Sequence, residues 1–132
     1  MPTGVSAPIA NSMLALMLNG TVWAGYNIIF AQLHTGPPGP NGTLSVAAES
    51  TRVSCGAAPA FAVPANGQSL NNNLILWSNV IAAETFSFVS LWNAATAGVF
   101  IVSGSITAQA INPGNNFSIP TGGLAISIPL AS

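Results

Sequence analysis

Side chains alternate with a two-residue period in short segments of this chain, and turns rich in glycine, proline or asparagine separate them. The period is clearest in 86–92 and 124–130, while 26–33 is rich in β-branched and aromatic residues. These features are typical of β-strands. The composition of residues 93–98 is typical of a turn, and residues 99–107 are therefore predicted to form the returning strand of a hairpin. The pattern predicts a mainly β fold, an antiparallel β-sandwich or barrel-like domain.

A helical pattern occupies residues 6–19. Ser6 can cap the N-terminus, Pro8 is tolerated in the first turn, and Gly20 stands where a helix would end. One apolar face repeats at helical spacing and comprises Ile9, Met13, Leu16 and Met17. We therefore expect one short N-terminal α-helix in a single domain spanning 6–132, preceded by a flexible arm at 1–5.

Charged side chains are almost absent: the 132 residues include only Glu49, Arg52 and Glu84. Typical soluble domains carry about 25% charged residues. Such a chain cannot neutralise phosphates, so we expect no nucleic-acid partner. Its apolar runs are much shorter than the roughly 20 residues that span a bilayer, so we expect no membrane insertion. A surface this poor in charge favours self-association, which indicates a subunit of an assembly.

The stretch LHTGPPGPNGT contains the only histidine, His34. A catalytic triad or zinc site would need acidic or further metal-binding partners, and the chain offers only Glu49, Glu84 and Cys55. We therefore interpret His34 as a structural, hydrogen-bonding residue and expect no enzyme activity, metal or cofactor. The prolines of this stretch remove N–H groups that a phosphate loop would need, so 36–42 is predicted to be a rigid, exposed elbow.

Several side chains are candidates for contacts with another protein. Trp23 and Trp77 are possible anchors, because aromatic residues are enriched in interface hot spots. Glu49 and Arg52 either form a local surface ion pair or fix the register of an interface. The N-terminal arm and the elbow are further candidates. The complete set of predicted contact residues is Trp23, His34, Pro37, Pro38, Pro40, Glu49, Arg52 and Trp77.

Over roughly residues 10–130, the chain resembles a family of small virion proteins of tailed bacteriophages. The resemblance rests on the segments ANSMLALMLNGT, LHTGPPGPNGT, AAESTR, VSLWNAATAGVFIVSGSIT and NPGNNFSIPTGGLAISI. Members are described as head decoration or minor capsid proteins, and some are labelled tail-fibre-like. The chain departs from the family pattern at Gly36 and Thr43, where polar or acidic residues are usual.

The resemblance implies a non-enzymatic capsid decoration protein that binds the major capsid protein on the outer surface of the phage head. We expect a homotrimer that bridges neighbouring capsid subunits. The alternative is a tail-fibre or receptor-binding module that holds a host surface glycan on an exposed tryptophan. A hydrolase built around His34 is a third class, for which we expect no activity.

Overall fold

The structure is a computed structural model and describes residues 4–131. In this range the chain forms one α-helix, α1 (Ala7–Asn19), and eight β-strands. The strands are β1 (Phe30–His34), β2 (Val53–Ser54), β3 (Gln68–Leu70), β4 (Ile75–Trp77), β5 (Glu84–Trp92), β6 (Phe100–Ile111), β7 (Phe117–Ile119) and β8 (Ala125–Ser127).

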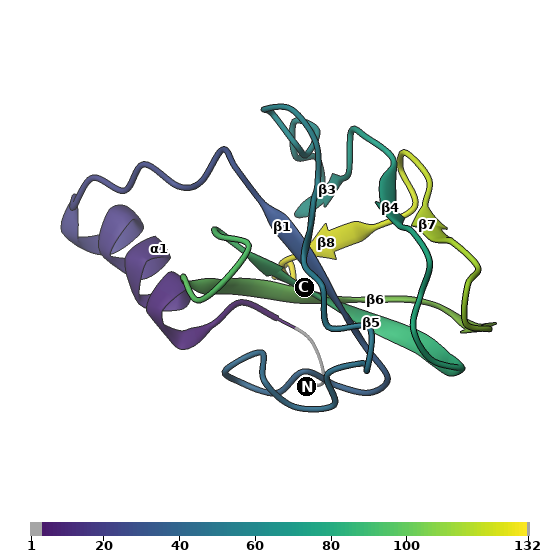
Figure 1. The fold of residues 1–132 in the computed structure, drawn as a ribbon. Coiled ribbons are helices and arrows are strands. Elements are labelled where there is room, and N and C mark those ends of the chain that lie inside the picture. The colour runs from purple at the N-terminus through teal and green to yellow at the C-terminus, as the bar shows by residue number, and fades with distance from the viewer. Residues whose placement is uncertain (1–3, 132) are drawn as a thin grey trace.

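The strands form one larger sheet and two small strand pairs, all antiparallel (Figure 1). The larger sheet has the order β2-β1-β5-β6, and the pairs are β3–β8 and β4–β7. Each pair joins residues that are 40 or more positions apart in the sequence. The predicted mainly β, sandwich-like fold with one N-terminal helix is confirmed.

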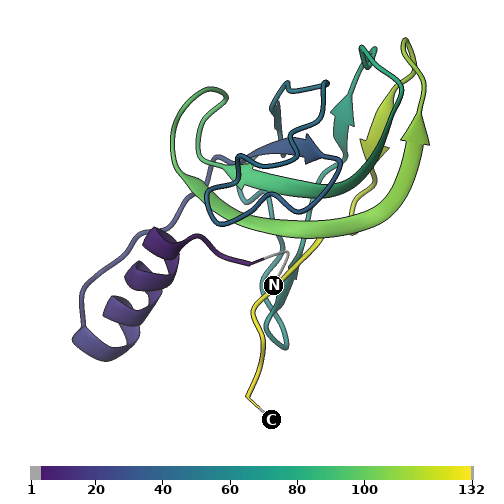
Figure 2. The same ribbon diagram turned by 90° about the horizontal axis from the view of Figure 1, so that it is seen from below.

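The β5–β6 hairpin supplies the two longest strands of the larger sheet, with β5 inside the sheet and β6 at its edge. Asn93 closes its turn, because its side-chain oxygen accepts a 2.7 Å hydrogen bond from the Val99 amide. A register shift between Phe86 and Phe88 marks a bulge in β5. Bulges increase the local bend and twist of a strand, and Figure 2 shows the hairpin curving around the rest of the domain. The predicted hairpin is confirmed, with both strands longer than expected.

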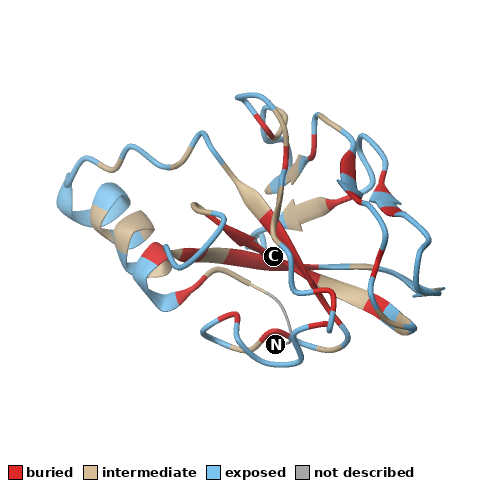
Figure 3. Ribbon diagram, viewed as in Figure 1, coloured by how far each residue is buried: buried red, intermediate tan, exposed pale blue. Residues whose placement is uncertain are grey.

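The hydrophobic core lies between one face of this sheet and the two small strand pairs. Leu33 and Val89 stand opposite each other in β1 and β5, and both are fully buried. Phe117 of β7 packs against Phe86 of β5, with ring centroids 5.1 Å apart, and against Trp77 of β4, at 5.9 Å. The buried residues therefore run through the middle of the larger sheet and onto the strand pairs (Figure 3).

Helix α1 has the predicted caps. The Ser6 hydroxyl accepts from the Ile9 amide, and Gly20 ends the helix in the left-handed region with φ of 66°. Of the predicted apolar face, only Ile9 is buried, while Leu16 and Met17 are 46% and 67% exposed. The reason is position, because α1 lies to one side of the sheets and only its first turns meet them (Figures 1 and 2).

Two residues of the expected N-terminal arm lie against the larger sheet. The Gly4 amide donates to the Ser103 hydroxyl at 3.1 Å, and Val5 forms an isolated bridge with Val102 of β6. These contacts place the start of the described chain along the outer edge of β6. Residues 1–3 of the expected arm lie outside the described range.

Candidate functional site

The proline- and glycine-rich elbow forms a compact loop. Its backbone is cross-linked by hydrogen bonds from the Thr35 amide to the Ser45 carbonyl (2.9 Å) and from the Leu44 amide to the Pro38 carbonyl (2.9 Å). Pro38 is buried, whereas Pro37 and Pro40 are exposed. The prediction of an exposed elbow is therefore wrong in part, because Pro38 and Gly42 are buried against the domain.

The elbow is attached to the sheet by a buried chain of hydrogen bonds through His34. His34 Nδ1 lies 2.8 Å from the Leu44 carbonyl oxygen, and its Nε2 lies 2.7 Å from the Ser90 hydroxyl. The indole N–H of Trp92 donates to the same hydroxyl at 2.8 Å. Because a carbonyl oxygen can only accept, Nδ1 carries the proton, and the Ser90 hydroxyl donates to Nε2.

This arrangement contains a serine–histidine pair but lacks the other parts of a nucleophilic triad. The His34 Nδ1 bonds to a backbone carbonyl, whereas a triad uses a carboxylate there. Both His34 and Ser90 have 0% exposure, so the structure gives a substrate no access to the hydroxyl. Among the described residues there is also no cluster of three or more potential metal ligands. The contacts identify His34 as a residue that fastens the elbow to β5.

His34 should make stability depend on pH. Burial lowers its pKa below the ordinary value of 6.5, although the Leu44 and Ser45 carbonyls partly oppose this. As pH falls through the unfolded-state value, the unfolded chain binds the proton before the folded chain does. Stability is therefore complete above about pH 6.5 and decreases below it, by at most about 1.4 kcal/mol per pH unit.

Chemical unfolding measured between about pH 7.5 and pH 5 checks this, because His34 is the only side chain with an ordinary pKa in that window. The thiol does not interfere, since burial raises the pKa of Cys55 to about 12. Stability that stays constant over the whole window would contradict the buried neutral imidazole.

The single cation is used inside the molecule. The Arg52 guanidinium lies over the Trp92 ring, 3.7 Å from its centroid. It donates to the carbonyls of Ala94 (3.0 Å) and Ala97 (2.6 Å) in the turn between β5 and β6. Arg52 thus ties this turn to the neighbouring loop, and cation–π stacking adds to the contact.

One of the two carboxylates is also engaged within the chain. Glu84 accepts hydrogen bonds from the amides of Ala48 (2.8 Å) and Glu49 (3.3 Å). Glu49 is only 6% exposed, and the described residues contain no ion pair between it and Arg52. The predicted local Glu49–Arg52 pair is therefore wrong, because Arg52 turns toward the β5–β6 turn.

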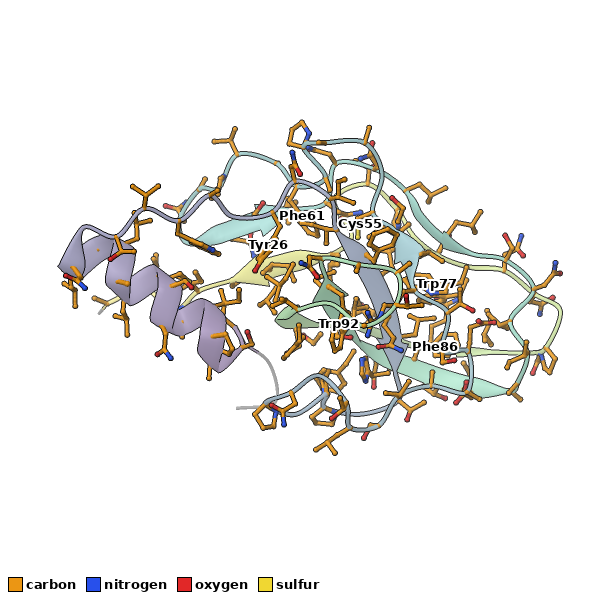
Figure 4. The ribbon with its side chains drawn as sticks, turned by 60° about the vertical axis from the view of Figure 1, so that its left-hand side comes forward. Tyr26, Cys55, Phe61, Trp77, Phe86 and Trp92 are labelled. Carbon is orange, nitrogen blue, oxygen red and sulfur yellow. The ribbon has the colours of Figure 1, made fainter. Side chains whose placement is uncertain are left out.

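The three tryptophans have different environments. Trp77 is 1% exposed and donates its indole N–H to the Thr51 carbonyl at 2.9 Å, which excludes it as a surface anchor. Trp92 is also buried. Trp23 is half-buried and packs edge-on against Tyr26, with centroids 6.3 Å apart. In Figure 4, Trp77 and Phe86 are labelled in the same part of the domain, away from Tyr26.

The eight predicted contact residues thus separate into two groups. Four are buried within the chain and cannot serve as exposed contacts: His34, Pro38, Glu49 and Trp77. Four reach the surface at least in part: Trp23, Pro37, Pro40 and Arg52. Of this second group, Pro40 lines the groove described below.

Exposed apolar side chains form two sets on the surface, and only Leu16 and Met17 among them belong to the apolar face predicted from the sequence. One set lies on α1 and the connector that follows it: Leu14, Leu16, Met17, Leu18, Val22 and Ile28. Another lies at and beyond the paired strands β3 and β8: Val63, Leu70, Ile128 and Leu130. Leu18, Val22 and Val63 are more than 80% exposed. The sequence feature that could have indicated the set on α1 is the composition of the helix, because α1 contains no charged residue.

A shallow groove of about 420 Å³ lies beside the start of α1. Trp92 and Phe100, each 7% exposed, contribute aromatic surface to it. The surrounding residues come from the first turn of α1, the elbow and the β5–β6 turn: Ser6, Pro8, Pro40, Asn41, Thr43, Gly98 and Val99. The groove therefore connects two of the motifs noted in the sequence with the base of the helix.

Comparison with known proteins identifies the family. No significant match was found among curated proteins. A family model described as podophage GP4 fiber I protein gp80 matches residues 4–127, which include α1 and all eight strands. Because this match spans nearly the whole chain, the chain belongs to this family of phage structural proteins.

Proposed function

We propose that this protein is a non-enzymatic capsid decoration protein that binds the outer surface of the assembled phage head and stabilises it. The observation that carries the proposal is the combination of exposed apolar side chains with charged groups engaged inside the chain. Large exposed apolar patches on soluble proteins mark interaction sites. The buried Ser90–His34 pair supports a structural rather than a catalytic role.

The proposed partner is the major capsid protein, with the decoration protein bound as a homotrimer that bridges neighbouring subunits. Specific protein interfaces bury about 1,200–2,000 Å² in total. Apolar burial contributes roughly 25 cal/mol per Å² before association costs, so a surface rich in leucine and valine can supply the attraction. Ion pairs contribute little here, because the chain has one cation and two carboxylates.

Attachment to the head should therefore be nearly independent of ionic strength. Salt screens exposed charge pairs but leaves apolar burial intact, or strengthens it. Purified particles washed at increasing salt concentration should retain the protein, as measured by its amount in the sedimented fraction. Washing with a mild non-ionic detergent provides the contrasting condition, in which release is expected. Complete release by moderate salt alone would contradict the apolar attachment.

A second candidate function is a fibre component that contacts the host surface. It is favoured by the family description, which refers to a fiber protein, and by the partly exposed Trp23–Tyr26 pair. Aromatic faces of this kind can stack on sugar rings. The fibre hypothesis expects Trp23→Ala to reduce adsorption of particles to host cells, whereas the decoration hypothesis expects no change.

Labelling the protein on intact particles tests the proposal directly. Decoration expects many copies distributed over the head. Labels restricted to the tail would overturn it in favour of the fibre component.

A further inference from the structure

Helix α1 carries a continuous stripe of exposed residues on the side that faces away from the β domain. Ile9, only 3% exposed, marks the inward side of the helix. With about 100° per residue, four residues fall within about 40° of the opposite direction. They are Ala7, Asn11, Leu14 and Leu18, and all four are exposed in the structure.

The spacing of this stripe is that of a coiled-coil seam. Successive members are separated by four, three and four residues, which is the a/d repeat of two interlocking helices. Leu14 is 49% exposed and Leu18 is 81% exposed, so the apolar part of the seam lacks a cover within the described chain. Leucines left in water on a helix surface favour packing against a partner.

The side chains that flank the seam indicate the partner. The flanking positions are Pro8, Ala10, Ala15 and Met17, and none carries a charge. Heterotypic helix pairs are usually selected by complementary charges at such positions. A second copy of α1 meets no like-charge repulsion here, and it presents the same apolar stripe.

We propose that α1 packs in parallel against α1 of further copies of this chain, with the stripe of Ala7, Asn11, Leu14 and Leu18 as the contact. Parallel alignment places Leu14 on Leu14, Leu18 on Leu18, and the Asn11 amide beside another Asn11 amide, where each can donate and accept. Antiparallel alignment sets Leu14 against Asn11 and leaves that amide facing an apolar side chain, which costs free energy.

The helix contact would hold together the oligomer proposed above, and it rests on the proposed function only in that α1 serves as a contact surface. The helix is about 20 Å long, which is short for a free-standing coiled coil. The contact therefore depends on the β domains, which hold the helix at its N-terminal end through Ser6 and Ile9.

The first test compares two variants with matched exposure on opposite sides of α1. Leu14 lies in the seam and is 49% exposed, whereas Leu16 lies farthest from it and is 46% exposed. Light scattering after size-exclusion chromatography should show an oligomer for the unaltered protein and for Leu16→Asn. Leu14→Asn should shift the protein to monomer, with circular dichroism confirming that both variants fold.

The second test detects the parallel arrangement by oxidation. The native thiol of Cys55 is buried, and its pKa is raised to about 12, so it does not form the cross-link. Leu18→Cys should give a disulfide-linked dimer on a non-reducing gel, and Leu16→Cys should remain largely uncrosslinked. Equal cross-linking of both variants, or no cross-linking of Leu18→Cys, would overturn the proposed seam.

A monomeric unaltered protein at its highest soluble concentration would also overturn the inference. These measurements use purified protein without virions, so their outcome does not depend on whether the protein binds the phage head. An oligomer that does not decorate the head would leave the helix contact standing and remove the decoration role.

Discussion

Replacing Gly42 with alanine is expected to destabilise the protein by about 2–5 kcal/mol, which is a large part of the stability of a domain this size. Gly42 has φ of +70°, a conformation that costs alanine about 1–2 kcal/mol. The added methyl carbon would lie 2.7 Å from Phe100 Cδ1 and 3.0 Å from Trp92 Cζ2. Both rings are held in the sheet, so relieving the overlap costs about 1–3 kcal/mol more.

Gly25→Ala is the matched control for this prediction. Gly25 has the same φ of +70°, but an added methyl group there meets no atom within 4 Å. The difference between the two variants in urea unfolding therefore measures the contact of the elbow with the aromatic rings. Equal destabilisation by both substitutions would show that the elbow is not packed against Trp92 and Phe100.

Ser90→Ala is expected to destabilise the protein by about 2–6 kcal/mol, because it removes one hydroxyl that two buried groups share. The Trp92 indole N–H loses its acceptor, and His34 Nε2 loses its donor. The imidazole cannot compensate by moving its proton to Nε2, since Nδ1 must still donate to the Leu44 carbonyl. A buried polar group left without a partner costs about 1–3 kcal/mol.

Ser105→Ala tests whether the effect is specific to the buried network. Ser105 lies on β6, opposite Phe88 in the same sheet, but it is exposed. Its replacement should change the free energy of unfolding by no more than about 0.5 kcal/mol. Thermal and urea unfolding of the two variants provide the measurement. A Ser90→Ala variant as stable as Ser105→Ala would mean that the His34 network does not hold the elbow.

Local features of the sequence predicted the fold class well. The alternation in 86–92 and the turn at 93–98 correspond to the hairpin of β5 and β6, because pairing across a short turn needs only neighbouring residues. Ser6, Pro8 and Gly20 located the helix, because capping acts within one turn of its ends. The family resemblance predicted a phage structural protein, and the match to the family model confirms this.

The candidate contact residues were harder to predict. Trp77 and Pro38 have the residue types expected at interfaces and turns, yet both are buried. Trp77 pairs across to β7, which follows about 40 residues later in the sequence. Arg52 reaches a turn more than 40 residues away, and so it does not meet Glu49. Long-range pairing of this kind leaves no periodic signal near the residue concerned.

The order of residues along the chain was sufficient to establish a charge-poor, mainly β protein with a capped N-terminal helix, because periodicity, capping and composition are local properties. Which side chains are covered depended on how distant segments meet in space. The fold buries His34 beneath its own elbow and engages Arg52 and Glu84 with backbone groups. It also holds α1 beside the sheets, so that Leu14, Leu16 and Leu18 remain exposed.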